Sequence, residues 1–309
     1  MSDRGVAKMN AAGRPNWLSA ELFPFESRFL DLDGCRLHYI DEGRGPVLLL
    51  LHGNPTWSFL YRHLVARLRH RFRCVALDYP GFGLSSAPND YGFTPAEHSS
   101  VVERFVVEVG LDSFTPLVHD WGGPIGLSVA SRHPERVRAL VLGNTFAWPL
   151  DGDRHFEWFS RLMGGAVGRL AIRRLNAFVN VVVPAGTRRR LSRPEMAHYR
   201  GPFPTPDARL PTHVLAREII ASRDFLAEVE AGLARLAHLP ALIAWGGSDF
   251  AFRDTERRRL EAVFPRHRSV VFEAARHYLQ EDVPEELAST IEEWWGEAGP
   301  RAALERRSP

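Results

Sequence analysis

Thr115-Pro116-Leu117-Val118-His119-Asp120-Trp121-Gly122-Gly123 is the stretch of sequence that decides the fold. Its apolar first half predicts a buried strand, and the small and apolar residues from Gly122 onward predict a helix directly after it. A sharp turn between a strand and a helix holds the side chain at its tip exposed above the sheet, as a nucleophile elbow does. The residue at this tip is Asp120. The stretch therefore predicts a carboxylate nucleophile that forms an ester on its own side chain.

Length and composition indicate an ordinary globular domain with a large insertion. The chain has 309 residues, of which 45% are hydrophobic and 25% charged. A net charge of +2 is too small to indicate nucleic acid or an anionic membrane as a partner. Cys35 and Cys74 are too few for a disulfide framework and have no metal-ligand neighbours in the sequence. Residues 1–15 hold no apolar region of a secretory signal and no apolar run is of membrane-spanning length, so we expect a cytoplasmic protein.

Apolar runs of strand length alternate with helical patterns along most of the chain. Helices are expected at residues 58–69 and 94–109, the second opening with the capping box Thr94-Pro95-Ala96-Glu97. This alternation predicts a mostly parallel, doubly wound α/β sheet. The expected strands are residues 36–40, 47–51, 74–77, 115–118, 139–142, 241–245 and 269–272.

The alternation stops between residues 144 and 212. This segment is rich in Phe, Trp and Arg, contains amphipathic stretches at residues 154–163 and 168–183, and ends in the proline-rich loop 202–211. A connection of roughly 70 residues is far longer than usual, which favours an inserted helical cap over a long crossover. We expect a core of residues 17–144 and 213–296, a helical cap of residues 145–212, and tails at residues 1–16 and 297–309.

Three further motifs follow expected strands. His52-Gly53-Asn54-Pro55 follows residues 47–51, Asp249 ends the motif Trp245-Gly246-Gly247-Ser248-Asp249, and His277 follows the last strand. The carboxyl ends of parallel strands meet at one edge of a sheet, so these side chains should lie near Asp120. Their order along the chain is nucleophile, acid and base: Asp120, Asp249 and His277.

Taken together, the motifs resemble those of the haloalkane dehalogenases in the α/β-hydrolase superfamily. The resemblance covers residues 17–295 and implies a mostly parallel, doubly wound eight-stranded sheet with an inserted helical cap. It further implies a small apolar halogenated substrate, halide ion as product, and no cofactor, metal, nucleic acid or membrane; the oligomeric state stays open. The matching stretches are His52-Gly53-Asn54-Pro55-Thr56-Trp57-Ser58, Tyr79-Pro80-Gly81-Phe82-Gly83-Leu84-Ser85, His119-Asp120-Trp121-Gly122-Gly123, Gly143-Asn144-Thr145-Phe146 and Tyr199-Arg200-Gly201-Pro202-Phe203.

The chemistry of this family explains the residue types. Asp120 would displace halide from carbon, because a carboxylate is already ionised at neutral pH and needs no base. His277 would then activate water against the ester while Asp249 orients its imidazole. Halide is a weak base, so its departure needs hydrogen-bond donors but no proton. The Trp121 indole and the Asn54 amide can supply these hydrogen bonds. The resemblance also implies an oxyanion hole formed by the backbone N–H groups of Asn54 and Trp121.

The acid has more than one candidate in the sequence, because dehalogenases place it after the sixth or the seventh strand. After the expected sixth strand the first carboxylate is Asp151, and after the seventh Asp254 is a weaker alternative to Asp249. An acid after the seventh strand together with Asn54 resembles the subfamily with an Asp-His-Asp triad and an Asn-Trp halide clamp.

Three other functions compete with dehalogenation. An epoxide hydrolase shares the fold and the Asp nucleophile but usually needs two cap tyrosines, and the expected cap holds only Tyr199. A fluoroacetate-type enzyme would carry arginines where Trp121 and Gly122 stand. A non-catalytic ligand receptor of this fold would have lost a member of the triad or turn over slowly. Substrate choice should depend on the packing of Phe146, Trp148, Phe178, Phe250 and Leu279.

Overall fold

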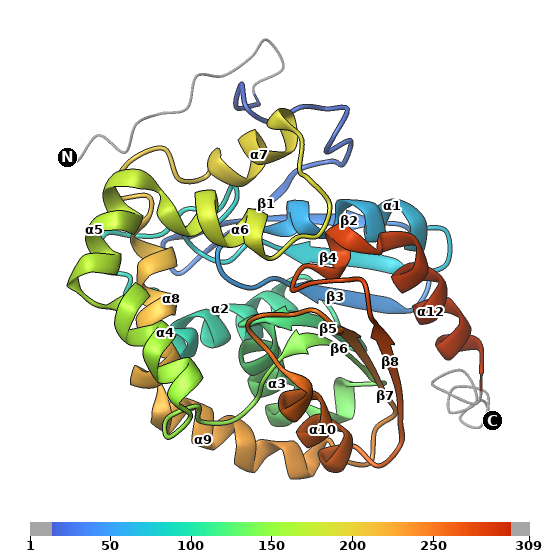
Figure 1. Cartoon of the computed structure of the whole chain (residues 1–309). Helices are drawn as coiled ribbons and strands as arrows, with labels where there is room; N and C mark the ends of the chain where they lie inside the picture. Colours follow the sequence, from blue (N-terminus) through green and yellow to red (C-terminus); the bar gives the residue numbers. More distant parts are fainter. Residues whose placement is uncertain (1–13, 298–309) are drawn as a thin grey trace.

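One mixed sheet forms the centre of the protein (Figure 1). The computed structural model describes residues 14–297, so the expectations for residues 1–13 and 298–309 lie outside the described chain. Eight strands lie in the order β1-β2-β4-β3-β5-β6-β7-β8. Their bounds are Arg28–Leu32, Cys35–Glu42, Val47–Leu51, Arg73–Leu77, Thr115–Asp120, Leu140–Thr145, Ala241–Gly246 and His267–Phe272 for β1 to β8.

The sheet is parallel from β4 to β8, as the sequence predicts. The leucine run of β3 pairs with β4 and β5 and is almost wholly buried, because helices cover both faces of the sheet. At one edge, β2 runs antiparallel to β4 and pairs with the hairpin strand β1. β1 is absent from the strands named from the sequence, since its exposed edge position shows no continuous apolar run.

The core helices lie on both faces of the sheet. α1 packs against α12 on one face, and α3 packs against α2 and α9 on the other (Figure 1). The expected capping box of α2 is present, with Thr94 and Glu97 exchanging side-chain and backbone hydrogen bonds. The bounds are Arg62–Leu68 for α1, Pro95–Glu108 for α2, Gly122–Arg132 for α3, Arg223–Gly232 for α9, Asp254–Val263 for α10, Leu279–Asp282 for α11 and Pro284–Gly296 for α12, with short 3₁₀ turns at Ser58–Tyr61, Pro134–Arg136 and Leu233–Arg235.

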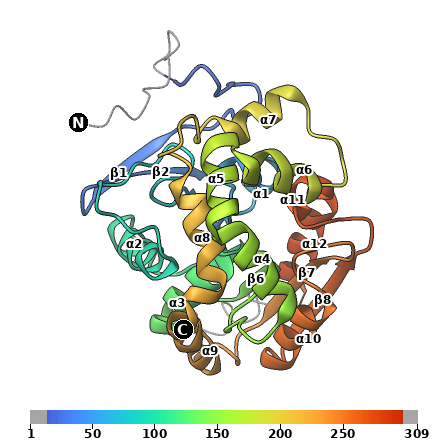
Figure 2. The ribbon, with the colours of Figure 1, turned by 60° about the vertical axis from the view of Figure 1, so that its left-hand side comes forward.

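Helices between β6 and β7 lie across the carboxyl ends of the strands, in front of the sheet in Figure 2. α4 packs against both α5 and α8. The boundary expected at residue 212 falls inside α8, so the division into core and cap stays a prediction. The bounds are Arg154–Gly164 for α4, Ala166–Leu175 for α5, Val183–Ala185 for α6, Arg193–Arg200 for α7 and Leu210–Ala221 for α8.

The amphipathic stretch at residues 168–183 does not form one continuous helix. α5 ends at Asn176, whose backbone is left-handed with φ of 51°, and a π-helical turn, η3, follows at Phe178–Val182 before α6. Asn tolerates this conformation better than most residues, so it ends the helix where periodicity alone predicts continuation. None of the described helices is long and apolar enough to cross a bilayer.

Candidate active site

Asp120 lies at the tip of the turn between β5 and α3. Its φ is +52°, a left-handed conformation that a residue other than glycine adopts only when its surroundings enforce it. Close packing supplies that constraint. A Cβ at Gly53 would collide with the Asp120 carboxylate, and one at Gly122 would collide with the Leu51 carbonyl. Both glycines are therefore needed for the loop after β3 to approach the elbow.

The structure brings together the three residues expected to form a triad. His277 Nδ1 lies 3.0 Å from Asp249 Oδ2, and His277 Nε2 lies 3.9 Å from Asp120 Oδ2. The first distance is a hydrogen bond, in which the imidazole N–H donates to the carboxylate. The second is longer than a hydrogen bond, so the proton-accepting nitrogen faces Asp120 without binding it. Asp249 and His277 are buried, whereas part of Asp120 is accessible.

The other two candidate acids lie elsewhere on the surface. Asp151 pairs with Arg223, and Asp254 pairs with Arg257 and Arg258 on α10. Neither lines the cavity above Asp120. Of the three carboxylates weighed for the acid, Asp249 alone contacts His277 among the described contacts.

Asn144 is a residue of the site that sequence reasoning missed. It ends β6 with a positive φ of 37°, and its carboxamide bridges two neighbouring strand ends. The amide donates to Asp249 Oδ2, and its oxygen accepts a 2.8 Å hydrogen bond from the Gly246 N–H. Asp249 Oδ1 accepts a third hydrogen bond of 2.7 Å from Ala251 N–H. The signal in the sequence was an asparagine shortly after the apolar run of residues 139–142, a position that the resemblance allows for the acid.

His119 is a second missed residue. It is fully buried beside the nucleophile, and its Nε2 donates a 2.9 Å hydrogen bond to the His277 carbonyl. Burial holds the pKa of His119 well below its ordinary value, so the ring is neutral and keeps the tautomer with a proton on Nε2. The contact fixes the backbone of the loop that carries the His277 imidazole.

Burial and neighbouring charges act in opposite directions on the pKa values of Asp120 and His277. Burial raises the pKa of Asp120, and the nearby His277 and the backbone N–H groups of Trp121 and Asn54 reduce but do not cancel that effect. Burial lowers the pKa of His277, but the charges of Asp249 and Asp120 outweigh it, and the net pKa is raised. Each side chain of the site thus stabilises the charged form of the other.

Two N–H donors flank the nucleophile. Asn54 N–H donates a 2.7 Å hydrogen bond to Asp120 Oδ1, and the side chains of Asn54 and Trp121 both line the cavity. The Asn54 amide donates one hydrogen to the Thr212 carbonyl at 2.9 Å, which orients the group and leaves its second N–H. The Trp121 indole packs edge-on against Phe146, and its N–H donates to no residue of the described chain.

The cavity above Asp120 measures about 60 Å³ and is mainly aromatic. α4, η3 and the loop after β7 supply its walls. Phe146, Phe178 and Phe250 line it as expected, whereas Trp148 and Leu279 do not. Trp148 lies under the Arg259 guanidinium on the other side of its loop, and Leu279 is buried in α11, so those two expectations are wrong. The lining side chains are Asn54, Asp120, Trp121, Phe146, Leu150, His155, Phe156, Phe159, Phe178, Val182, Ile219, Phe250, Ala251, Phe252 and His277.

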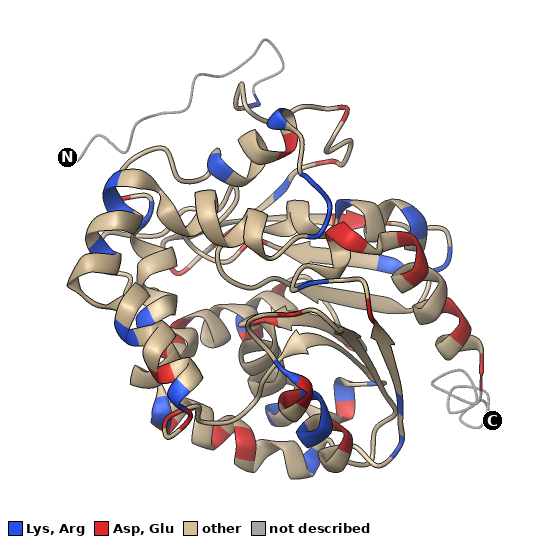
Figure 3. Ribbon diagram, viewed as in Figure 1, with Lys and Arg blue, Asp and Glu red and all other residues tan. Residues whose placement is uncertain are grey.

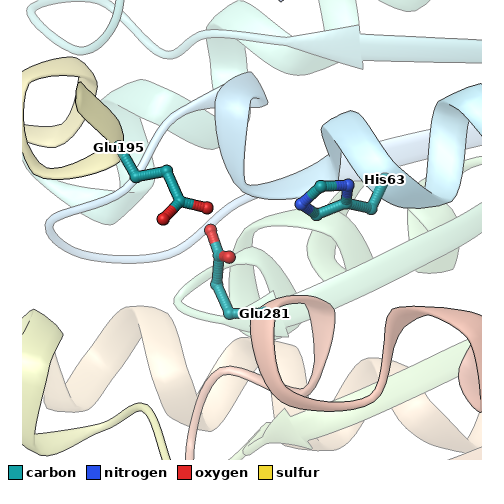
Figure 4. Close-up of side chains that lie close together, drawn as sticks. All are labelled: His63, Glu195 and Glu281. Carbon is teal, nitrogen blue, oxygen red and sulfur yellow. The ribbon is translucent and has the colours of Figure 1, made fainter. Parts of the chain in front are cut away.

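A second cluster of titratable side chains joins α1, α7 and α11. His63, Glu195 and Glu281 lie close enough to share a cation (Figure 4). Both carboxylates are already paired, because Arg62 binds Glu281 through two nitrogens at 2.5 and 2.9 Å and Glu195 at 3.0 Å. Arg189 also donates to both carboxylates. Two guanidinium groups disfavour a further cation there, so the cluster is an ion-pair network between the core and α7.

Comparisons with known proteins agree with this geometry. Residues 46–284 match the model of the α/β hydrolase fold family, so the chain belongs to that family. It is 46% identical to "Haloalkane dehalogenase 2" of Mycobacterium tuberculosis over 89% of this chain and 97% of the relative. A loop variant of the haloalkane dehalogenase DbeA from Bradyrhizobium elkanii superposes with a TM-score of 0.83 at 28% identity, covering 92% of this chain and 100% of the other. Within the α/β hydrolases, the protein belongs to the haloalkane dehalogenase family.

A relative with another activity also matches. The "Cis-3-alkyl-4-alkyloxetan-2-one decarboxylase" of Xanthomonas campestris pv. campestris is 33% identical over 92% of this chain and 97% of its own length. Similarity at this level does not separate the two chemistries. The shape of the cavity and its hydrogen-bond donors are the features that separate the two activities.

Proposed function

We propose that the protein hydrolyses the carbon–halogen bond of haloalkanes, releasing a primary alcohol and halide through an alkyl ester of Asp120. The observation that carries the proposal is the combination of an elbow carboxylate with two neutral N–H donors in one apolar cavity. A carboxylate attacks saturated carbon without an activating base, and a departing halide needs hydrogen-bond donors but no proton.

In the first step a carboxylate oxygen of Asp120 forms a bond to the halogen-bearing carbon. The carbon–halogen bond breaks, and its electron pair leaves with the halide. Trp121 N–H and the free N–H of the Asn54 amide stabilise the developing charge in a cavity lined mainly by apolar and aromatic side chains. The hydrogen bond that the Asn54 amide donates to the Thr212 carbonyl holds this amide in place before the substrate arrives.

In the second step water attacks the carbonyl carbon of the ester. His277 Nε2 takes the proton from the water, and the 3.9 Å separation from Asp120 leaves its lone pair directed at that region. Asp249 stabilises the resulting imidazolium through the Nδ1 hydrogen bond. The proton then passes from His277 to the departing alkoxide, which leaves as the alcohol. Asp120 is left as a carboxylic acid, and the loss of its proton to solvent restores the carboxylate.

The charge change in the first step prepares the second. The free Asp120 carboxylate helps to raise the pKa of His277. Esterification removes that negative charge, so the pKa of His277 falls just when a neutral imidazole is needed as base. The ionised nucleophile and the neutral base are thus required at different stages of the reaction.

The geometry argues against an epoxide hydrolase. Opening an epoxide requires acids that protonate an alkoxide, for which that family uses cap tyrosines. Tyr199 is fully buried, donates its hydroxyl hydrogen to Glu281, and does not line the cavity. Among the described residues that line the cavity there is no tyrosine.

The activity printed for the oxetanone decarboxylase is a second candidate, favoured by 33% identity over nearly the whole chain. Its named substrate carries two alkyl groups on adjacent ring carbons. A cavity of about 60 Å³ suits one narrow chain better than two, which favours the haloalkane.

A substrate panel with two clamp variants tests the proposal. Bromoalkanes should turn over faster than chloroalkanes because the carbon–bromine bond is weaker, and simple epoxides and cis-dialkyl oxetanones should react little. Trp121→Phe and Asn54→Ala should each slow halide release by about 10²–10³ if they act as single oxyanion donors do. Phe203→Leu, which changes a buried aromatic outside the cavity lining, is the control. Epoxide or oxetanone turnover above that of bromoalkanes would contradict the proposal.

A further inference from the structure

The exposed apolar side chains gather on one part of the surface. Among the described residues, nine large apolar side chains are exposed, and six of them lie between residues 158 and 181. Trp158 is 66% exposed, Val167 74% and Leu175 71%. Monomeric soluble proteins rarely leave such side chains together without a partner. We call this set the cap patch: Trp158, Leu162, Val167, Leu170, Leu175 and Val181.

Five of the six cap-patch residues lie on two adjacent helices, α4 and α5, and the sixth, Val181, lies on η3. α4 and α5 pack against each other and cross the front of the molecule in Figure 2. Trp158 and Leu162 are four residues apart on α4, and Val167 and Leu170 are three apart on α5, so each pair shares one helix face. Their opposite faces hold Phe156, Ser160 and Ile172, which are buried. Each helix is therefore apolar toward the protein and toward the solvent.

Arginines surround the cap patch. Residues 154–176 contain five arginines and one acidic residue, Glu157, so their net charge is +4, against +2 for the whole chain. Figure 3 shows these basic positions on α4 and α5. Arg154, Arg169 and Arg174 are exposed and form no salt bridge with any residue in the described range 14–297. Arginines next to exposed Trp and Leu on amphipathic helices are typical of segments that lie in the interface of an anionic membrane.

A groove beside α5 combines basic and apolar side chains. Its walls are the three arginines Arg169, Arg173 and Arg174 together with the apolar residues Ala166, Leu170 and Pro206. Guanidinium groups bind phosphate through several N–H groups at once. Arg173 is already paired with Asp207, so Arg169 and Arg174 supply the donors for a phosphate group next to an apolar floor for a lipid chain.

We propose that the α4–α5 face binds the surface of an anionic phospholipid membrane, with lipid phosphates at the arginine groove and the cap patch among the acyl chains. Charge favours this occupant over a second copy of the chain, because two identical faces with a net charge of +4 repel each other. The net charge of the whole molecule conceals the site, since acidic residues elsewhere offset this local excess.

The location of the α4–α5 face indicates the class of substrate. This part of the inference rests on the proposed dehalogenase function. Phe159 and Val182 line the cavity, and each directly follows a residue of the cap patch, Trp158 or Val181. A face seated on lipid would therefore place the cavity next to the bilayer. At about 60 Å³, the cavity is better matched to one narrow chain than to a branched one. We infer that long-chain terminal haloalkanes dissolved in the membrane are taken up with the halogenated end first.

Vesicle sedimentation of the full chain tests the binding. The protein should sediment with vesicles of phosphatidylcholine and phosphatidylglycerol, much less with phosphatidylcholine alone, and salt should release it. Arg169→Glu and Arg174→Glu should each weaken binding about fivefold or more, as expected for one basic residue at an anionic surface. Trp158→Ser with Leu170→Ser should abolish it. Matched controls are Arg44→Glu and Val107→Ser, which change an exposed arginine and an exposed apolar residue far from α4 and α5 and should leave binding unchanged.

Activity measurements separate this inference from the proposed function. All these variants should release halide from a short, water-soluble bromoalkane at the wild-type rate, because none of the changed residues lines the cavity. The cap-patch and arginine variants should lose only the faster turnover of a long-chain bromoalkane carried in anionic vesicles. Absence of vesicle binding, or equal binding by the control and cap variants, would overturn the inference. Self-association that the cap variants abolish, without vesicle binding, would assign the face to a second copy instead.

Discussion

At the scale of single residues, Asp120 and His277 divide the reaction between them. His277 lies too far from Asp120 to activate it, so alkylation should survive its removal. His277→Phe should release about one halide per site and then stop as the alkyl-enzyme. Mass spectrometry should find the added alkyl group on the peptide that contains Asp120. The control Asp120→Asn should give neither the burst nor the adduct, and continued turnover by His277→Phe would contradict its role as base.

The pH dependence of turnover should report the charge of Asp120. The base must be neutral, so ester hydrolysis proceeds above the pKa of His277 and is lost as the pH falls through it. In the free enzyme the charges of Asp249 and Asp120 raise that pKa over the opposing effect of burial. In the ester the Asp120 charge is gone. When hydrolysis limits the rate, kcat should therefore fall at a lower pH than the NMR titration of His277 in the free enzyme.

The variant Asp120→Asn tests whether the charge of Asp120 raises the pKa of His277. Asp120→Asn removes the same charge permanently and should lower the pKa of His277 in the free protein. If the midpoint of kcat equals or exceeds the free-enzyme titration, the two groups are not coupled as the geometry indicates.

Asn144 should act through Asp249 rather than on the substrate. Asn144→Ala removes a hydrogen bond to a carboxylate, and such bonds are worth about 1.5–3 kcal/mol, so ester hydrolysis should slow by roughly 10–10². The halide burst should stay at the wild-type rate, which a general loss of structure would not permit. Asn180→Ala, at an exposed asparagine on η3, is the control. Asp249→Asn should be more severe in the same step, while Asp254→Asn should be mild.

At the scale of elements, the network around Arg62 joins α1, α7 and the short helix after His277. Glu281→Gln leaves the buried Arg62 without its bidentate partner and should lower the free energy of unfolding by about 3–5 kcal/mol in urea denaturation. Glu230→Gln breaks a pair with Arg259 in which both side chains are exposed, and it should cost less than about 1 kcal/mol. Equal effects of the two variants would show that the buried network does not hold these elements together.

Strong periodic patterns could be predicted from the sequence, whereas long-range contacts could not. The leucine run of β3 and the capping box of α2 act locally, so their residues identify the elements directly. β1 depends on pairing with β2 along an exposed edge, and no local pattern marks it. In the same way, the motifs named Asp120, Asp249 and His277, which the structure brings close together. The hydrogen bond of Asn144 joins residues 105 positions apart and is visible only in the fold.

At the scale of the whole molecule, charge is unevenly distributed. On α4 and α5 the arginines outnumber the acidic residues by five to one, whereas α12 carries four glutamates and no arginine (Figure 3). A net charge of +2 averages these regions and excludes anionic partners only when charge is spread evenly. The small net charge therefore does not conflict with the proposed membrane-binding face on α4 and α5. Which face carries a charge is determined by the fold.

Four consecutive residues of the loop after β7 both orient His277 and form part of the cavity wall. Asp249 holds the imidazole, and the next three residues, Phe250, Ala251 and Phe252, form one wall of the cavity. Ala251 N–H also donates to Asp249, and its carbonyl accepts from His155 on α4. An engineer who wishes to alter substrate preference therefore has unequal freedom on the two sides of the cavity. Randomising Phe159 or Phe178 changes the shape alone, whereas randomising Phe250 to Phe252 also disturbs the acid, so libraries directed at the α4 and η3 side should yield more active clones.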